Sequence, residues 1–185
     1  GIFLTNSNSA NFLSIDGTVG STQAHAITGG ITAGATIAIG ETAEEIKVVA
    51  RWLSNRKDEG IKPHEIGVFV RSAAELDRAR RAVEEAGFLF KVLDEHVETT
   101  NGYVSISTMH LAKGLEFRTV VVMACDDEII PSQERIETVA DDADLEEVYN
   151  TERHLLYVAC TRARDHLLVT SVNPASEFLD DLRAK

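Results

Sequence analysis

A short run of chemically active side chains lies between two apolar segments of the chain: Thr108, His110, Lys113, Gly114 and Glu116. Residues 105–107 before it are strand-forming, and residues 118–123 after it are mostly apolar and β-branched, which is typical of a buried strand. Loops that a rigid sheet holds in place are where binding chemistry concentrates. The density of hydroxyl, imidazole, ammonium and carboxylate groups therefore predicts a binding loop at residues 108–116.

A second group of candidate residues ends the segment 152–164, where Arg162 and Arg164 follow a predicted helix and precede a strand. Arginine presents a planar fork of donors that suits bidentate contact with phosphate. The plainer interpretation is that both arginines complement the negative end of the helix macrodipole. The residues alone leave both interpretations open.

These side chains need a scaffold, and the chain alternates apolar runs with segments of helical period. Strands are predicted at 36–39, 66–70, 88–93, 105–108, 119–124 and 166–171, and helices at 41–53, 72–86, 144–162 and 176–182. Thr42 and Glu45 match a capping box, and Gly87 fits the end of a helix. The pattern indicates an α/β fold whose mostly parallel sheet is covered by helices. Ligands of such sheets bind at the carboxyl ends of the strands, where the loop 108–116 is expected.

A phosphate-binding loop of the Gly-x-x-x-x-Gly-Lys-Ser/Thr type is missing from the sequence. Residues 29–34 carry three glycines but lack the lysine. We therefore expect that the chain cannot bind and split a nucleoside triphosphate unaided. Residues 1–35 are poor in charge and are interpreted as an irregular segment, or as the start of a piece cut from a longer protein. Residues 36–185 are expected to form one domain.

The composition is that of a globular protein with an acidic balance. The chain has 185 residues, of which 44% are hydrophobic, and a net charge of −12, which argues against a free-standing nucleic-acid binder. No apolar run is long enough to span a membrane. Cys125 and Cys160 have no ligand cluster beside them, so we expect no metal site and two free thiols in the cytoplasm. The acidic stretch 126–147 is either a solvated loop or a partner site.

Two long segments carry a family resemblance. Residues 108–117 (Thr-Met-His-Leu-Ala-Lys-Gly-Leu-Glu-Phe) and 155–164 (Leu-Leu-Tyr-Val-Ala-Cys-Thr-Arg-Ala-Arg) resemble motifs V and VI of the UvrD/Rep-like superfamily 1 helicases. The resemblance covers about residues 41–182. It implies the second, C-terminal RecA-like domain, a three-layer sandwich with helices on both faces of a mostly parallel sheet. The segment 93–104 is too short for the accessory domain of many relatives, so the chain resembles the compact members.

The resemblance also implies roles for the nucleotide-binding residues. In that family ATP lies between two RecA-like domains, and the second domain closes over it. Arg162 then matches the arginine finger that reaches the γ-phosphate, where positive charge stabilises the transition state. Glu116 matches the residue that hydrogen-bonds the ribose, and Gly114 lies in the same ATP-binding segment. ATP and Mg²⁺ would be held mainly by the other domain, and neither is expected in this chain alone.

The resemblance also implies that some residues contact single-stranded DNA. Thr108, His110 and Lys113 match the part of motif V that contacts the strand. From their place at the start of a predicted helix, we infer that Arg71 and Ser72 hold a DNA phosphate.

Together these assignments predict the C-terminal motor domain of an ATP-dependent DNA helicase or translocase, inactive by itself. Its expected partners are single-stranded DNA and the N-terminal RecA-like domain of the same protein. The alternative is a catalytically degenerate, stand-alone RecA-like module with a binding or regulatory role. A Rossmann-type oxidoreductase is disfavoured because no Gly-x-Gly-x-x-Gly follows a predicted strand.

Overall fold

The computed structural model describes residues 2–7, 10–15, 23–26, 33–39, 41–95, 98–139 and 142–182. The strands are β1 (Ile2–Ser7), β2 (Ala10–Ile15), β3 (Gln23–Ala26), β4 (Ala33–Ile39), β5 (Ile66–Val70), β6 (Phe90–Val92), β7 (Val104–Thr108), β8 (Phe117–Val122) and β9 (Ala163–Val172). The α-helices are α1 (Thr42–Asp58), α2 (Leu76–Glu85), α3 (Gln133–Glu137) and α4 (Asp142–Cys160). Short 3-10 helices are η1 (Pro63–Glu65), η2 (Ala73–Glu75), η3 (Met109–Ala112) and η4 (Glu177–Leu182).

The fold is organised around a sheet of strand order β3-β4-β9-β8-β5-β7-β6. Every neighbouring pair from β4 to β6 is parallel, and β3 joins the edge antiparallel to β4. Because the strands alternate with helices, each return crossing lays a helix or loop on one face of the sheet. The predicted α/β fold with a mostly parallel sheet is confirmed.

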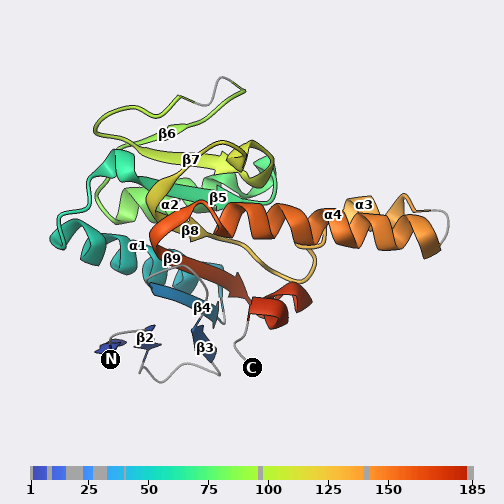
Figure 1. Cartoon of the computed structure of the whole chain (residues 1–185), viewed down its shortest axis with the longest axis horizontal. Coiled ribbons are helices and arrows are strands. Elements are labelled where there is room, and N and C mark those ends of the chain that lie inside the picture. The colour runs from blue at the N-terminus through green and yellow to red at the C-terminus, as the bar shows by residue number, and fades with distance from the viewer. Residues whose placement is uncertain are drawn as a thin grey trace.

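Two hydrophobic cores lie on opposite faces of this sheet. Along β5, Val68 and Val70 belong to the core that α1 and α2 cover, whereas Phe69 between them belongs to the core of α4, η3 and η4. Successive side chains of a strand point to opposite faces, so this alternation places helices on both. Figure 1 shows α4 crossing one face of the sheet. The three-layer arrangement is thus confirmed.

The first helix begins as predicted but without the predicted cap. Glu41 is its N-cap residue, and no side chain caps the helix by a hydrogen bond. The proposed capping box is wrong because the Glu45 carboxylate is fully buried and hydrogen-bonds elsewhere. The helix 72–86 is confirmed in two parts, η2 and α2, and the residue after it, Gly87, has the positive φ of 74° expected there.

The acidic stretch that follows β8 is more ordered than predicted. Ile130 and Pro131 are buried, α3 forms within the stretch, and α4 begins at Asp142 rather than at residue 144. Figure 1 shows α3 and the first turns of α4 extending together beyond the sheet. The exposed-loop interpretation is therefore wrong for α3 and for the buried Ile130 and Pro131, whereas the other described side chains of the stretch are exposed or half-buried.

The described part of residues 1–35 is not irregular. It contains β1, β2, β3 and the start of β4, which pairs in parallel with β9 from Ala33 onward. No strand periodicity was visible in residues 1–35, because short strands of mixed polarity resemble loops in sequence. The division of the chain at residue 35 stays a prediction.

Candidate functional site

The loop 108–116 runs from the carboxyl ends of the strands to their amino ends, two sides of the sheet that we call the carboxyl edge and the amino edge. Thr108 ends β7 and is in register with Val70 at the carboxyl end of β5. Phe117 begins β8 and is in register with Ala163 at the amino end of β9. A strand of six residues such as β8 is about 17 Å long. Contrary to the expectation from the sequence, only the first part of the loop lies at the carboxyl edge.

The residues predicted to meet DNA occupy the first part of this loop. Thr108 precedes η3 and is half-buried, whereas His110 within η3 and Lys113 just after it are exposed. Partial burial and then the positive charge of Arg71 lower the pKa of His110, although Glu152 opposes the effect. The imidazole is therefore neutral near pH 7 and available as a hydrogen-bond donor or acceptor.

Arg71 lies beside these residues but is not free. Its side chain is buried and makes a bidentate ion pair with Glu152 of α4, with Nε–Oε2 and Nη2–Oε1 distances of 2.5 Å. Next to it, Ser72 uses its hydroxyl to accept a hydrogen bond from the amide of Ala74 at 3.3 Å. A phosphate at this position would have to compete with the Glu152 carboxylate, so a direct role of Arg71 in phosphate binding is weakened.

The residues predicted to meet ATP lie together at the amino edge. Gly114 has a positive φ of 83°, which turns the exposed loop back toward the start of β8. Glu116 is exposed and lies 3.5 Å from the guanidinium of Arg164, the second residue of β9. The amide of Phe117 donates to the carbonyl of Arg162 at 2.9 Å, so the loop end and the end of α4 are joined directly.

Arg162 is held in place by neutral acceptors. Its guanidinium donates to the carbonyls of Val158 and Leu115, at 3.0 and 3.4 Å, and to the hydroxyl of Thr161 at 3.1 Å. Over the described residues, no carboxylate lies within ion-pair distance of it. A half-exposed arginine that is oriented but not neutralised keeps its full charge for an anion.

The sequence did not reveal a buried polar network on the face of the sheet that α1 and α2 cover. This network links the two helices to β9 and to the residues after β8. Glu45 pairs with Arg78, accepts from the Thr170 hydroxyl at 2.6 Å and accepts from the Ala124 amide at 3.1 Å. Burial raises the pKa of Glu45, and Arg78 acts against this shift. Arg78 also binds Asp126 at 2.7 Å. The available signal was the position of Glu45 on the apolar stripe of α1, where an acid must find a partner.

The sequence did not reveal the role of Glu152 either. The same signal was available, because Glu152 falls on the apolar stripe of α4. It is 0% exposed and binds Arg135 at 2.8 Å in addition to Arg71. Burial opposes its ionisation, but the two arginines outweigh this effect and hold the pKa of Glu152 below its usual value.

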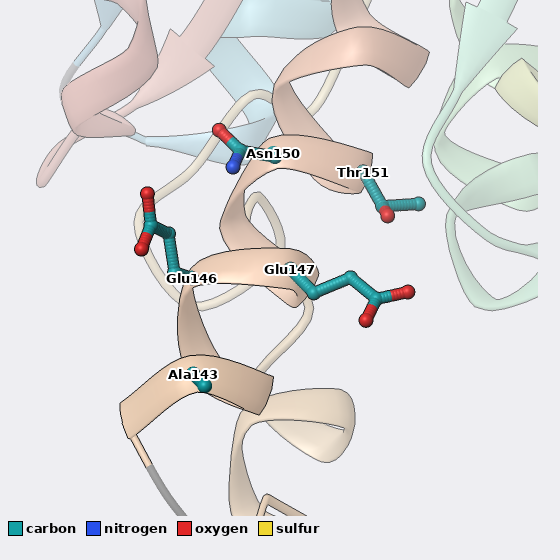
Figure 2. Close-up of a pocket in the computed structure, with 5 residues that line it drawn as sticks. All are labelled: Ala143, Glu146, Glu147, Asn150 and Thr151. Atoms are coloured by element: carbon teal, nitrogen blue, oxygen red, sulfur yellow. The ribbon is translucent and has the colours of Figure 1, made fainter.

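The pocket in Figure 2 lies away from the predicted site. Five residues on successive turns of the projecting part of α4 line it: Ala143, Glu146, Glu147, Asn150 and Thr151. None of the predicted site residues takes part. Among the described residues, no group of histidines, cysteines and acids could hold a metal ion, and no helix is long and apolar enough to cross a membrane.

Three curated proteins are similar to parts of this chain. The ATP-dependent DNA helicase UvrD1 of Mycobacterium leprae is 35% identical over 113 residues, covering 52% of this chain and 14% of the relative. The ATP-dependent DNA helicase PcrA of Staphylococcus epidermidis is 40% identical over 84 residues, covering 45% and 11%. The DNA helicase II of Rickettsia typhi is 32% identical over 117 residues, covering 62% and 17%. The chain thus matches less than a fifth of each relative's length.

A solved structure has the same fold. The C-terminal domain of a possible DNA helicase from Lactobacillus plantarum superposes with a TM-score of 0.56 at 22% identity, covering 78% of this chain and 77% of that one. In addition, the family model of the UvrD-like helicase C-terminal domain matches residues 42–174, a span that includes the whole loop 108–116. The chain belongs to the family of UvrD-like helicase C-terminal domains.

Proposed function

We propose that this chain acts as the C-terminal motor domain of an ATP-dependent DNA helicase or translocase. In the complete protein it would close over ATP held by an N-terminal RecA-like domain and would supply part of a groove for single-stranded DNA. Family membership supports this role. The observation that carries it is the span of the loop 108–116, whose two groups of polar residues lie at opposite edges of the sheet.

The amino edge is suited to a nucleotide. Arg162 would place its charge beside the γ-phosphate, where charge accumulates as the phosphoryl group is transferred. Its bonds to Val158 and Leu115 fix the direction of the guanidinium before ATP arrives. Glu116 would accept hydrogen bonds from the ribose, and Gly114 would let the backbone turn close to it. Mg²⁺ would neutralise phosphate charge, held mainly by the N-terminal domain.

The carboxyl-edge part of the loop is suited to a nucleic acid backbone. Lys113 offers an exposed ammonium, and Thr108 and His110 offer hydrogen-bonding groups nearby. Phosphate contacts from cations dominate the affinity for DNA and make it dependent on salt. With a net charge of −12, this domain would form only one wall of the groove. The N-terminal domain would provide the other wall.

The two halves of the loop can be tested separately in the complete protein. We expect Lys113→Ala to weaken binding of a single-stranded oligonucleotide by about tenfold, as for loss of one charged hydrogen bond, with little change in KM for ATP. Glu116→Ala should do the reverse, raising KM for ATP and leaving DNA affinity nearly unchanged. Fluorescence anisotropy and steady-state ATP hydrolysis measure the two quantities.

Lys47→Ala is the matched control for loss of a positive charge. Lys47 is exposed on α1, which covers the opposite face of the sheet from η3. Lys47→Ala should change neither the affinity for the oligonucleotide nor the KM for ATP. If Lys113→Ala and Glu116→Ala instead affected DNA and ATP equally, the division of the loop into two sites would be wrong.

A further inference from the structure

A buried ion cluster joins the body of α4 to the carboxyl end of β5 and to α3, within electrostatic reach of His110 in the loop 108–116. Its centre is Glu152, 0% exposed, which receives bonds from Arg71 at 2.5 Å, from Nη1 of Arg135 at 2.8 Å and from the amide of Ser132 at 3.3 Å. A buried carboxylate requires this number of donors because each unfilled acceptor is costly away from water. The cluster therefore holds its four members in one arrangement.

The members come from three parts of the molecule. Arg71 immediately follows β5, Glu152 lies in the middle of α4, and Ser132 and Arg135 belong to α3 and the residue before it. Removing Glu152 would leave the buried guanidinium of Arg71 without its carboxylate. The carboxyl end of β5, the helix α4 and the segment before it are thus fixed to one another at a single side chain.

The cluster is in electrostatic contact with the DNA-facing part of the loop. Arg71, Glu152 and Arg135 all act on His110, whose pKa is lowered first by burial and then by Arg71. The 3-10 helix that carries His110 packs on α4, with Met109 and Ala112 in the same core as Leu156 and Ala159. A displacement of η3 therefore acts directly on α4.

The C-terminal end of α4 leads to the amino edge, where the nucleotide is proposed to bind. Arg162 follows Glu152 by ten positions, which is about 15 Å along a helix. The helix runs from the carboxyl edge, where Glu152 lies, to the amino edge, where Arg162 meets the loop again through Leu115 and Phe117. One rigid element thus connects both ends of the loop 108–116.

We propose that Glu152 is a positioning residue that transmits binding of single-stranded DNA at the loop to Arg162 at the ATP site. This inference rests on the proposed function. Glu152 touches neither ligand. Glu152 holds α4 in place beside η3, which packs on this helix. A shift of η3 on DNA binding would therefore move α4, and with it Arg162 just beyond the end of the helix. Without Glu152, the two sites work independently.

The test compares ATP hydrolysis with and without single-stranded DNA in the complete protein. Glu152→Gln keeps the size of the side chain and removes its charge. Arg135→Gln is the milder variant, because Arg135 is half-exposed and the buried pair of Arg71 and Glu152 remains. The matched control is Glu146→Gln, the same change on an exposed position of the same helix, drawn in Figure 2.

We expect Glu152→Gln to reduce the stimulation by DNA by about tenfold, within the usual range of coupling between sites, while hydrolysis without DNA and KM for ATP stay near wild type. Arg135→Gln should cause a smaller loss of the same kind, and Glu146→Gln none. If Glu152→Gln fails to fold, as judged by its melting curve, Arg135→Gln alone decides the question.

Two results would overturn the inference while the proposed function stands. One is full stimulation by DNA in a folded Glu152→Gln protein, or in Arg135→Gln if only that variant folds. The other is an equal loss of hydrolysis with and without DNA, which marks a structural role only. A wild-type protein whose hydrolysis does not respond to DNA would instead refute the proposed function, and the inference with it.

Discussion

The arginines of this domain differ in what surrounds their charge. Arg71 and Arg78 are buried and each is paired with a buried carboxylate, whereas Arg162 is half-exposed and bonds to two carbonyls and a hydroxyl. A paired, buried arginine stabilises one packing arrangement, and its charge is already used. Only an oriented arginine without a carboxylate has its charge available for a ligand. This difference supports the proposal that Arg162 serves the nucleotide, whereas Arg71 holds the scaffold together.

His166 gives the domain a pH-dependent contact at the end of α1. Nη1 of Arg56 lies 3.1 Å from Nδ1 of His166, and since arginine can only donate, the ring nitrogen must accept. Burial and then Arg56 lower the pKa of His166, with Arg118 acting in the same direction and Glu59 and Asp165 against it. Because the folded state disfavours the proton, the unfolded state binds more protons, and stability falls with decreasing pH.

We therefore expect the melting temperature of the domain to drop as the pH is lowered below about 6.5, the usual pKa of histidine. His166→Gln, which can still accept from Arg56 but does not titrate, should show a flatter dependence between pH 7 and about pH 5. His110 titrates in both proteins, so its effect cancels in the comparison. Equal slopes for the two proteins would refute this role of His166.

At the scale of elements, α4 and the closing 3-10 helix η4 form a packed unit. Phe178 of η4 is 1% exposed, its ring lies 5.7 Å from that of Tyr149 in an edge-to-face arrangement, and the guanidinium of Arg153 lies 4.7 Å above it. These contacts anchor the last described residues of the chain on the helix that leads to Arg162.

Phe178→Ala should lower the free energy of unfolding by about 3–5 kcal/mol, the usual effect of truncating a buried phenylalanine. The matched control is Leu89→Ala, because Leu89 is 65% exposed and should change stability by less than about 0.5 kcal/mol. Urea denaturation followed by circular dichroism measures both. A loss below about 1 kcal/mol for Phe178→Ala would mean that η4 is not anchored on α4.

The sequence predicted the elements better than it predicted their spatial relations. The strand at 66–70 and the helix that Gly87 ends were found because apolar periodicity and glycine report local geometry. The whole loop 108–116 was placed at the carboxyl ends of the strands, although a connection between parallel strands must return to the amino end of the next strand. Glu45 was taken for a cap because a local pattern cannot show partners that are distant in sequence, such as Ala124 and Thr170.

At the scale of the whole molecule, the acidic balance limits what the domain can do alone. Its net charge is −12, and the projecting helices α3 and α4 carry many of the acids. The proposed DNA binding would therefore depend on a few local cations such as Lys113 and on the cations of a second domain.

The isolated domain should bind a single-stranded oligonucleotide weakly at low salt and lose that binding as salt is raised. Fluorescence anisotropy over a salt series measures this, and Lys113→Ala should remove most of the residual binding while Lys47→Ala does not. Tight binding that is insensitive to salt would contradict the picture of a domain that forms only one wall of the groove.

In the proposed function, Arg162 provides the charge that a nucleotide needs from this domain. The most direct test of this role is ATP turnover in the complete protein carrying Arg162→Ala, with ATP binding measured in parallel by a fluorescent analogue. We expect turnover to fall by about 10³-fold or more, as for loss of an arginine finger, while the affinity for ATP changes little. Turnover at the wild-type rate in that variant would rule out the arginine-finger role of Arg162.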